Sequence, residues 1–182
     1  AESVETEENT ATVTKATKES PNIIVIMNEA FSDLSVLGDF ETNEDYMPFL
    51  HSLMQEGTPN TISGHLNVSV LGGNTANTEF EFLTGNTMAF LPQGSVAYQQ
   101  YVKSNDYSIA TYLKSKGYDT IAMHPYNASG WDRDKVYPLL GFDTFYSLKD
   151  WVNPVKIRKY VSDQSCYDKI IELYEQKDAN TP

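Results

Sequence analysis

The sequence lacks three features that would each define a class of protein. Cys166 is the only cysteine, so no disulfide can form within the chain and cysteine usage does not reveal the redox compartment. No apolar run approaches the ~20 residues that span a bilayer, and no signal peptide opens the chain. We therefore expect the chain as given to be soluble, while a membrane anchor in a longer parent protein stays open.

Positive charge is the third scarce feature. The 13 basic residues are outnumbered by 25 acidic ones, which gives a formal net charge of −12. This balance excludes the cationic surface that nucleic-acid binding requires, and it does not favour simple attraction to anionic lipid. A phosphate-bearing substrate would have to be held by a few local cations or by a metal ion.

The composition supports one globular domain behind a short acidic tail. Of the 182 residues, 40% are apolar and 12% are aromatic, which is enough to build a core. Residues 1–20 contain five Glu, five Thr and two Lys, a composition typical of a flexible linker. We therefore predict a linker at 1–20 and a single domain at 21–182.

Apolar runs and helical spacing alternate along residues 21–182. Asn22–Met27 and Asp119–Met123 read as parallel strands buried on both faces, and we expect them to be neighbours in one sheet. The spacing predicts a covering helix at Met47–Glu56, a helix starting near Thr75, and further helices at Ser108–Lys116, Asp132–Leu140 and Asp163–Gln176, the last with Asp163 as N-cap. This alternation predicts an α/β fold with a mainly parallel sheet flanked by helices.

Polar residues directly follow the two predicted strands. Glu29 comes after the first strand and His124 after the second. Ligands gather at the carboxyl ends of strands in open α/β sheets, and a carboxylate beside an imidazole suits metal or phosphate chemistry. The alternative is structural, with Glu29 capping a turn and His124 a hydrogen-bonded histidine at the core edge.

A second candidate functional site lies in the stretch GGNTANTEF. Gly72 and Gly73 permit a tight turn, which places Thr75 in the first turn of a helix. A helix N-terminus favours an anionic phosphoryl group beside that hydroxyl, so Thr75 is placed like a nucleophile. Thr75 as an ordinary N-cap is the alternative, and Thr78 is a weaker competitor for the nucleophilic role.

Trp131 and Arg133 form a third candidate beyond the His124 strand. Arginine offers a planar fork of donors to phosphate oxygens, and tryptophan offers a flat wall for a small polyol. Alternatively, Trp131 packs in the core and Arg133 pairs with Asp134 or another surface acid.

These candidates occur in an order that resembles a known family. From Pro21 to about Asn180, through NIIVIMNEAFSDL, GGNTANTEFEFLTG, LPQGS, MHPYNASGWDRD and GFDTFY, the chain resembles the lipoteichoic-acid-synthase type of phosphoglycerol transferase, in the alkaline phosphatase and sulfatase superfamily. The resemblance implies that Glu29 and Thr75 bind a divalent metal, usually Mn²⁺ with Mg²⁺ as an alternative. It also implies that Thr75 is the nucleophile and that His124, Trp131 and Arg133 line the glycerophosphate pocket.

The resemblance implies an enzyme that works on the outer face of the bacterial cell membrane. It would move glycerophosphate from phosphatidylglycerol to a cell-envelope polymer or glycolipid through a threonine-linked intermediate, in a membrane-anchored parent. A phosphoethanolamine transferase and a non-catalytic domain for anionic wall polymers are the alternatives. A formylglycine sulfatase is disfavoured, because Cys166 lies in QSCYDKI and lacks the required C/S-x-P-x-R setting.

The chain also departs from the family pattern. Tyr126 stands where some members carry an acid, two residues after the pocket histidine. The Asp-His metal pair of the family and a further pocket histidine are expected beyond Pro182. We therefore expect a fold that is incomplete on its C-terminal side, weak metal binding and no transferase activity from this chain alone.

Overall fold

The computed structural model describes residues 20–28 and 31–182. The helices in this part of the chain are α1 (Pro48–Met54), α2 (Thr75–Thr84), α3 (Ala97–Gln100), α4 (Ile109–Ser115), α5 (Arg133–Leu139) and α6 (Asp163–Gln176). The strands are β1 (Ile121–Met123), β2 (Thr144–Tyr146), β3 (Lys156–Ile157) and β4 (Tyr160–Val161). Short 3₁₀ turns lie at η1 (Leu34–Leu37), η2 (Met88–Phe90), η3 (Gly130–Asp132) and η4 (Leu148–Asp150).

A β-α-β unit forms the centre of the fold. β1 and β2 are parallel, with Ala122 opposite Phe145, and α5 lies between them in the chain. At their starts, the Thr120 hydroxyl donates to the Asp143 carboxylate over 2.7 Å and the Asp143 N–H donates to the Thr120 carbonyl over 2.8 Å. The strand predicted at Asp119–Met123 is thus confirmed in shorter form, whereas β2 was not predicted.

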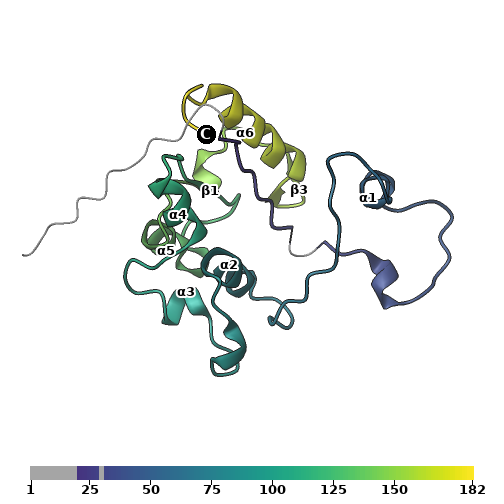
Figure 1. Ribbon diagram of the computed structural model, residues 1–182, viewed down its shortest axis with the longest axis horizontal. Helices are drawn as coiled ribbons and strands as arrows, with labels where there is room; N and C mark the ends of the chain where they lie inside the picture. The colour runs from purple at the N-terminus through teal and green to yellow at the C-terminus, as the bar shows by residue number, and fades with distance from the viewer. Residues whose placement is uncertain (1–19, 29–30) are drawn as a thin grey trace, which may run out of the picture.

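Helices α2, α3 and α5 pack with β1 around one core (Figure 1). Its buried members are the side chains of Ala76, Phe80, Val96, Ala97, Tyr98, Val102, Ala122, Val136, Tyr137 and Leu140. The apolar positions of α5 recur every three to four residues, so one face of the helix is buried and the other is polar. This packing holds α2 and the segment after β1 in one body.

Local capping explains where two of the predicted helices begin. Ser108 forms a reciprocal capping box with Thr111 at the start of α4. At α6 the N-cap is Ser162, whose hydroxyl accepts a hydrogen bond from the Ser165 N–H. The prediction of α6 is confirmed, but Asp163 as its cap was wrong, because Ser162 has the extended backbone that a cap requires.

The apolar run Asn22–Met27 does not form the strand that was predicted. It has no ladder with another described strand, and β1 pairs with β2 instead. Ile23, Ile24, Val25 and Ile26 are each about half exposed, at 49%, 56%, 56% and 53%. A strand of this composition is stable when neighbours cover both faces, and no described segment supplies them.

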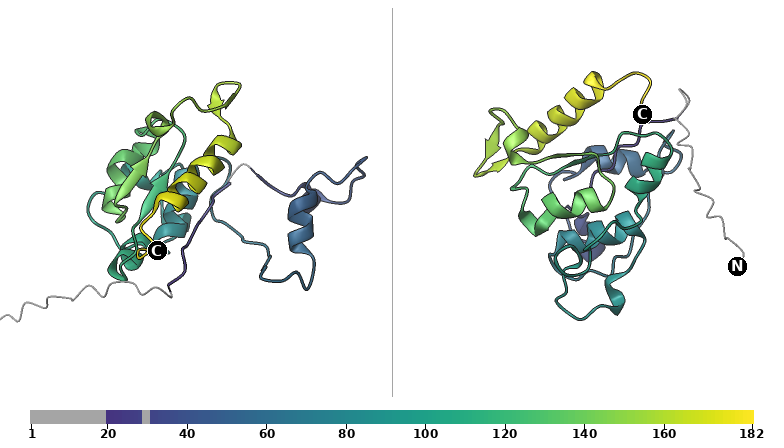
Figure 2. Two further views of the ribbon diagram at one scale, coloured as in Figure 1. Left: turned by 90° about the horizontal axis from the view of Figure 1, so that it is seen from above. Right: turned by 90° about the vertical axis from the view of Figure 1, so that its left-hand side faces the viewer.

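The helix predicted at Met47–Glu56 exists as α1, but it covers nothing. No residue of α1 is buried, and Phe49 is 71% exposed. Figure 1 and the left-hand view of Figure 2 show the segment that carries α1 standing away from the β-α-β body. The expectation of a covering helix was therefore wrong, because an apolar stripe needs a facing surface before it can be buried.

Candidate active site

Helix α2 begins after an unusual run of left-handed residues. Gly72, Gly73 and Asn74 have φ angles of 55°, 65° and 60°, and Thr75 is the first helical residue. Glycine adopts this conformation without a steric penalty, and asparagine tolerates it better than most residues. Asn74 takes the N-cap position, so Thr75 is not the cap, and the predicted place of Thr75 in the first helical turn is confirmed.

Asn77 ties the start of α2 to the segment LPQGS. It is 5% exposed, and its side-chain amide donates to the Ser95 carbonyl while its side-chain oxygen accepts from the Ala97 N–H, both over 2.9 Å. Both hydrogen bonds are shielded from water, so breaking either one leaves a buried polar group unsatisfied. The position of Thr75 is therefore fixed by contacts made two residues further along the helix.

His124 lies at the carboxyl end of β1, as predicted. Its backbone N–H donates to the Tyr146 carbonyl of β2 over 2.9 Å. Burial lowers the pKa of its imidazole below the ordinary value of 6.5, and the positive charge of Arg133 lowers it further, against an opposing effect of Glu79. The ring is therefore neutral at pH 7 and able to accept a proton.

Trp131 and Asp132 form a strained turn ahead of α5. Their φ angles are 56° and 58°, in the left-handed region that costs an ordinary residue about 1–2 kcal/mol. Trp131 is partly buried against the core, so the structural alternative for this residue holds in part. Backbone strain of this kind persists only where the surrounding packing enforces it.

Arg133 is buried, and its principal partner is Glu79 of α2. Its Nε and Nη2 donate to the two Glu79 carboxylate oxygens over 3.2 and 2.6 Å, and Nη1 donates to the Gly130 carbonyl over 3.4 Å. The Tyr137 hydroxyl donates to the same carboxylate over 3.0 Å. Arg133 is 1% exposed, so the structural alternative, in which it pairs with Asp134 or another surface acid, holds only in that its partner is an acid: that acid is Glu79.

The electrostatics of this cluster keep the pair charged. Burial opposes the charged form of Arg133, but the hydrogen bond and the negative charge of Glu79 outweigh it and raise the pKa of the guanidinium. Burial is also the main cause that raises the pKa of the Tyr137 hydroxyl. A charged, bidentate pair shielded from solvent is a rigid link between α2 and α5.

Glu79 was missed from the sequence, although one signal was present. It lies four residues after Thr75 in TANTE, and positions i and i+4 share a helix face. An acid on the face of a proposed nucleophile calls for a basic partner. The sequence did not indicate that this basic partner is Arg133, because the two residues are 54 positions apart in the chain.

The structure brings most of the predicted residues together and leaves one outside. Arg133 lies close enough to His124 to affect its titration, and it is joined through Glu79 to the helix that Thr75 begins. Glu29 lies outside the described residues, so its predicted position beside His124 stays a prediction. Within residues 20–28 and 31–182, no three His, Cys, Asp or Glu side chains form a metal-binding group. No described helix combines the length and the apolar character needed to cross a bilayer.

Comparison with known proteins establishes the family. The sequence profile of the Sulfatase family matches residues 21–182, so this chain belongs to the sulfatase family, which is a family of enzymes. A putative cyclic beta-1,2-glucan modification protein of Rhizobium meliloti (strain 1021) is 38% identical over 86% of the chain and 23% of its own length. Lipoteichoic acid synthase 1 of Bacillus subtilis (strain 168) is 32% identical over 71% of the chain and 20% of its own length.

A solved structure agrees with the fold. The Streptococcus pyogenes phosphoglycerol transferase GacH, in complex with sn-glycerol-1-phosphate, superimposes with a TM-score of 0.53 at 30% identity, over 64% of this chain and 31% of GacH. The prediction of a sulfatase-like α/β fold is confirmed. The chain spans less than a third of the length of each of these relatives.

Proposed function

We propose that the full-length protein transfers glycerophosphate from phosphatidylglycerol to a cell-envelope polymer or glycolipid, with Thr75 as the nucleophile. The observation that carries this proposal is the start of α2, where three left-handed residues present Thr75 at the N-terminus of a ten-residue helix. The positive end of the helix dipole favours a phosphoryl group there. The names of the Bacillus subtilis and Streptococcus pyogenes relatives support glycerophosphate as the transferred group.

The transfer takes two displacements at phosphorus. The Thr75 oxygen forms a bond to the phosphorus of phosphatidylglycerol, the bond from phosphorus to diacylglycerol breaks, and the Thr75 proton leaves with the diacylglycerol oxygen. An acceptor hydroxyl then attacks the glycerophosphoryl-threonine, and Thr75 regains a proton as it is released. This chemistry needs a group that accepts a proton near neutral pH, and the imidazole of His124, whose pKa is lowered by burial so that the ring is neutral, suits that task.

His124, Trp131 and Arg133 are proposed to line the glycerophosphate site. The Arg133 Nε–H is shared by Glu79 and Tyr137, one Nη2 N–H donates to Glu79 and one Nη1 N–H donates to Gly130, so these bonds use three of the five N–H groups of the guanidinium. The bidentate Glu79 contact fixes the plane of the guanidinium. Trp131, on the turn before Arg133, would contact the glycerol carbons.

A divalent metal, Mn²⁺ or Mg²⁺, is proposed to bind Glu29 and Thr75. Thr75 is the one proposed ligand within the described residues, and no three His, Cys, Asp or Glu side chains form a group there. The described part of the chain therefore does not by itself fit a complete metal site. Positive charge from such an ion would favour the deprotonated Thr75 hydroxyl and offset charge on the phosphoryl group. The use of divalent metals across the superfamily supports this assignment.

We propose that this activity is located at the outer face of the bacterial cell membrane, in a membrane-anchored parent. The acceptor is a glycerophosphate polymer or a glycolipid, and the name of the Rhizobium meliloti relative adds a glucan to these candidates. The surplus of 25 acidic over 13 basic residues supports a local site rather than a broad anionic-lipid contact, and it argues against nucleic acid as a partner.

The decisive test replaces Thr75 and its neighbour in turn. In the full-length protein, Thr75→Ala should abolish release of diacylglycerol from a fluorescent phosphatidylglycerol, while the fold is retained. Thr78→Ala is the matched control, because Thr78 lies in the same helix and is also partly buried. Parental turnover by Thr75→Ala, with loss in Thr78→Ala, would exclude Thr75 as the nucleophile.

A further inference from the structure

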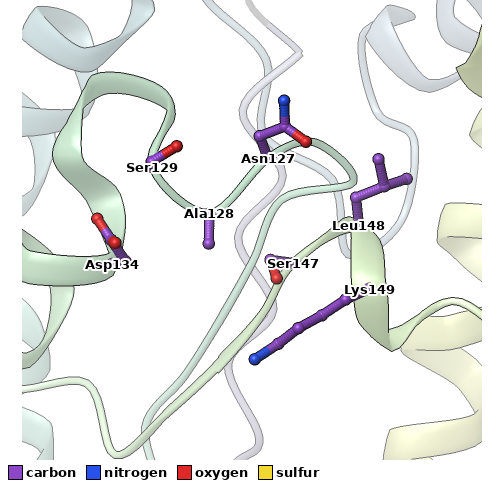
Figure 3. Close-up of a pocket in the computed structure, with 7 residues that line it drawn as sticks. All are labelled: Asn127, Ala128, Ser129, Asp134, Ser147, Leu148 and Lys149. Atoms are coloured by element: carbon purple, nitrogen blue, oxygen red, sulfur yellow. The ribbon is translucent and has the colours of Figure 1, made fainter.

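A pocket of about 470 Å³ lies beside the candidate active site, between the segments that follow β1 and β2 (Figure 3). Residues 127–129 form one wall and residues 147–149 the other, and Asp134 closes one side from the first turn of α5. This volume is within the range of about 300–1,000 Å³ that is typical of ligand pockets. Both walls continue from the strand ends where His124 lies.

Backbone hydrogen bonds fix the walls of the pocket. The Leu148 N–H donates to the Tyr126 carbonyl over 2.9 Å, which joins the two segments. The Asp134 N–H donates to the Ala128 carbonyl over 3.0 Å, which joins the first segment to α5. These bonds hold the pocket walls in place without a ligand, so binding would not include the entropic cost of ordering these segments.

Polar side chains of mixed charge line this space. Within residues 20–28 and 31–182, the side chains of Asn127, Ser129, Asp134 and Lys149 make no hydrogen bond or ion pair. Figure 3 shows Lys149 extending toward the space and Asp134 on the opposite side. One cation faces one anion, so the pocket has no net charge and favours a neutral ligand with many hydroxyl groups over a free phosphate.

Two exposed aromatic rings lie near the pocket wall that begins at Asn127. Tyr126, whose carbonyl joins the two walls, is 44% exposed, and its ring centre lies 6.2 Å from that of Tyr160, which is 51% exposed. An exposed tyrosine offers an apolar face with a polar hydroxyl at its edge. A sugar ring has the matching character, with C–H groups on its faces and hydroxyl groups around its rim.

We propose that this pocket binds a neutral sugar residue of the molecule that accepts the transferred group. The inference rests on the proposed function and names the substrate class for its second step. Asn127, Ser129 and Lys149 contact sugar hydroxyls, and Asp134 accepts from them. Tyr126, the exposed neighbour of Asn127 in the chain, packs against the ring. Because the pocket adjoins the strand end that carries His124, one sugar hydroxyl lies on the side of the site where transfer takes place.

Sugar binding is testable on the 182-residue chain without any transfer reaction. Saturation-transfer NMR with a β-1,2-linked glucose disaccharide should show binding, and Lys149→Ala or Tyr126→Ala should weaken it about tenfold, the effect of losing roughly 1.4 kcal/mol of contact. Lys116→Ala and Tyr107→Ala are the controls, because Lys116 and Tyr107 are exposed residues outside the pocket and their loss should leave binding unchanged. Circular dichroism verifies that each variant is folded.

Two results would overturn the sugar site, and neither depends on catalysis. The first is an absence of disaccharide binding, or binding that is equal in pocket and control variants. The second is binding of inorganic phosphate that is lost in Lys149→Ala, without disaccharide binding, which would make this an anion site. Thr75→Ala should bind the disaccharide normally, so failure of the nucleophile assignment is distinguishable from failure of the sugar site.

Discussion

Glu79 and Arg133 form a buried ion pair that joins the helix of the proposed nucleophile to the turn of the proposed glycerophosphate pocket. The Arg133 side chain is 2% exposed and the Glu79 side chain 15%, and their closest approach is 2.6 Å between Nη2 and Oε1. Because α2 starts at Thr75 and α5 starts at Arg133, the pair fixes the distance between two separate helix N-termini.

Breaking this pair should cost far more than breaking a surface pair. Arg133→Met leaves the Glu79 carboxylate buried without its cation, so we expect urea denaturation to show a loss of about 3–5 kcal/mol in the free energy of unfolding. Replacing both residues, as Glu79→Leu with Arg133→Met, should recover much of that loss, because no uncompensated charge is left.

The control for this prediction is the exposed pair of Lys135 and Asp132, which lie 2.8 Å apart. Lys135→Met should cost no more than about 1 kcal/mol. Equal effects of Lys135→Met and Arg133→Met would show that the Glu79 contact is not a structural link.

The left-handed backbone at Asn74 predicts a specific order of variants. Its φ of 60° disfavours a β-carbon without a compensating polar group, so Asn74→Ala should destabilise the chain by about 1 kcal/mol, whereas Asn74→Gly should be close to neutral. Asn86→Ala, at an exposed position just after α2, should change stability by less than about 0.5 kcal/mol. The free energies of unfolding in urea test this order, and a larger loss in Asn74→Gly than in Asn74→Ala would contradict it.

Much of this local structure could be predicted from the sequence, because it is encoded over short distances. Two glycines ahead of Thr75 predicted a tight turn into α2, and Ser108 with Gly117 bounded α4. Capping and left-handed turns depend on a few neighbouring residues, so a single sequence reveals them.

Long-range partners could not be predicted in the same way. For Arg133 the structural alternative named Asp134 or another surface acid as partner, because nothing in the local pattern shows that Glu79 approaches from another helix. The parallel partner of β1 was also assigned wrongly: the short segment Thr144–Tyr146 pairs with it, although Asn22–Met27 has the stronger apolar pattern. Apolar composition indicates that a strand is to be buried, but it does not specify its neighbour.

His124 should make stability depend on pH in a defined direction. Its folded-state pKa is lowered by burial, so between that value and the unfolded value near 6.5 the unfolded chain binds more protons. The free energy of unfolding should therefore hold its full His124 contribution above pH 6.5 and fall as the pH drops below it.

Urea unfolding from pH 7.5 to pH 5 would measure this slope. His124→Asn should flatten it, because asparagine does not titrate, and His65→Asn is the matched control at an exposed position. Stability that rises as the pH falls, in a manner abolished by His124→Asn, would mean that His124 gains a proton on folding.

Metal binding by this chain should be weak even if the ligands are assigned correctly. The proposal places Glu29 and Thr75 on the metal, and the described residues supply no group of three acidic, histidine or cysteine side chains. A divalent cation generally needs at least three protein ligands to be held against water, so two leave it largely hydrated. Calorimetric titration of the 182-residue chain with Mn²⁺ should therefore show binding well weaker than micromolar.

Two variants and a control make the metal prediction specific. Glu29→Gln and Thr75→Ala should abolish the residual Mn²⁺ heat, whereas Glu41→Gln, which removes one exposed acid elsewhere, should leave it unchanged. Loss of the Mn²⁺ heat in all three variants alike would indicate diffuse attraction of the cation to a chain of net charge −12 rather than binding at a site. One-to-one binding at micromolar affinity or tighter would show that the chain holds further ligands and that the assignment of Glu29 and Thr75 is incomplete.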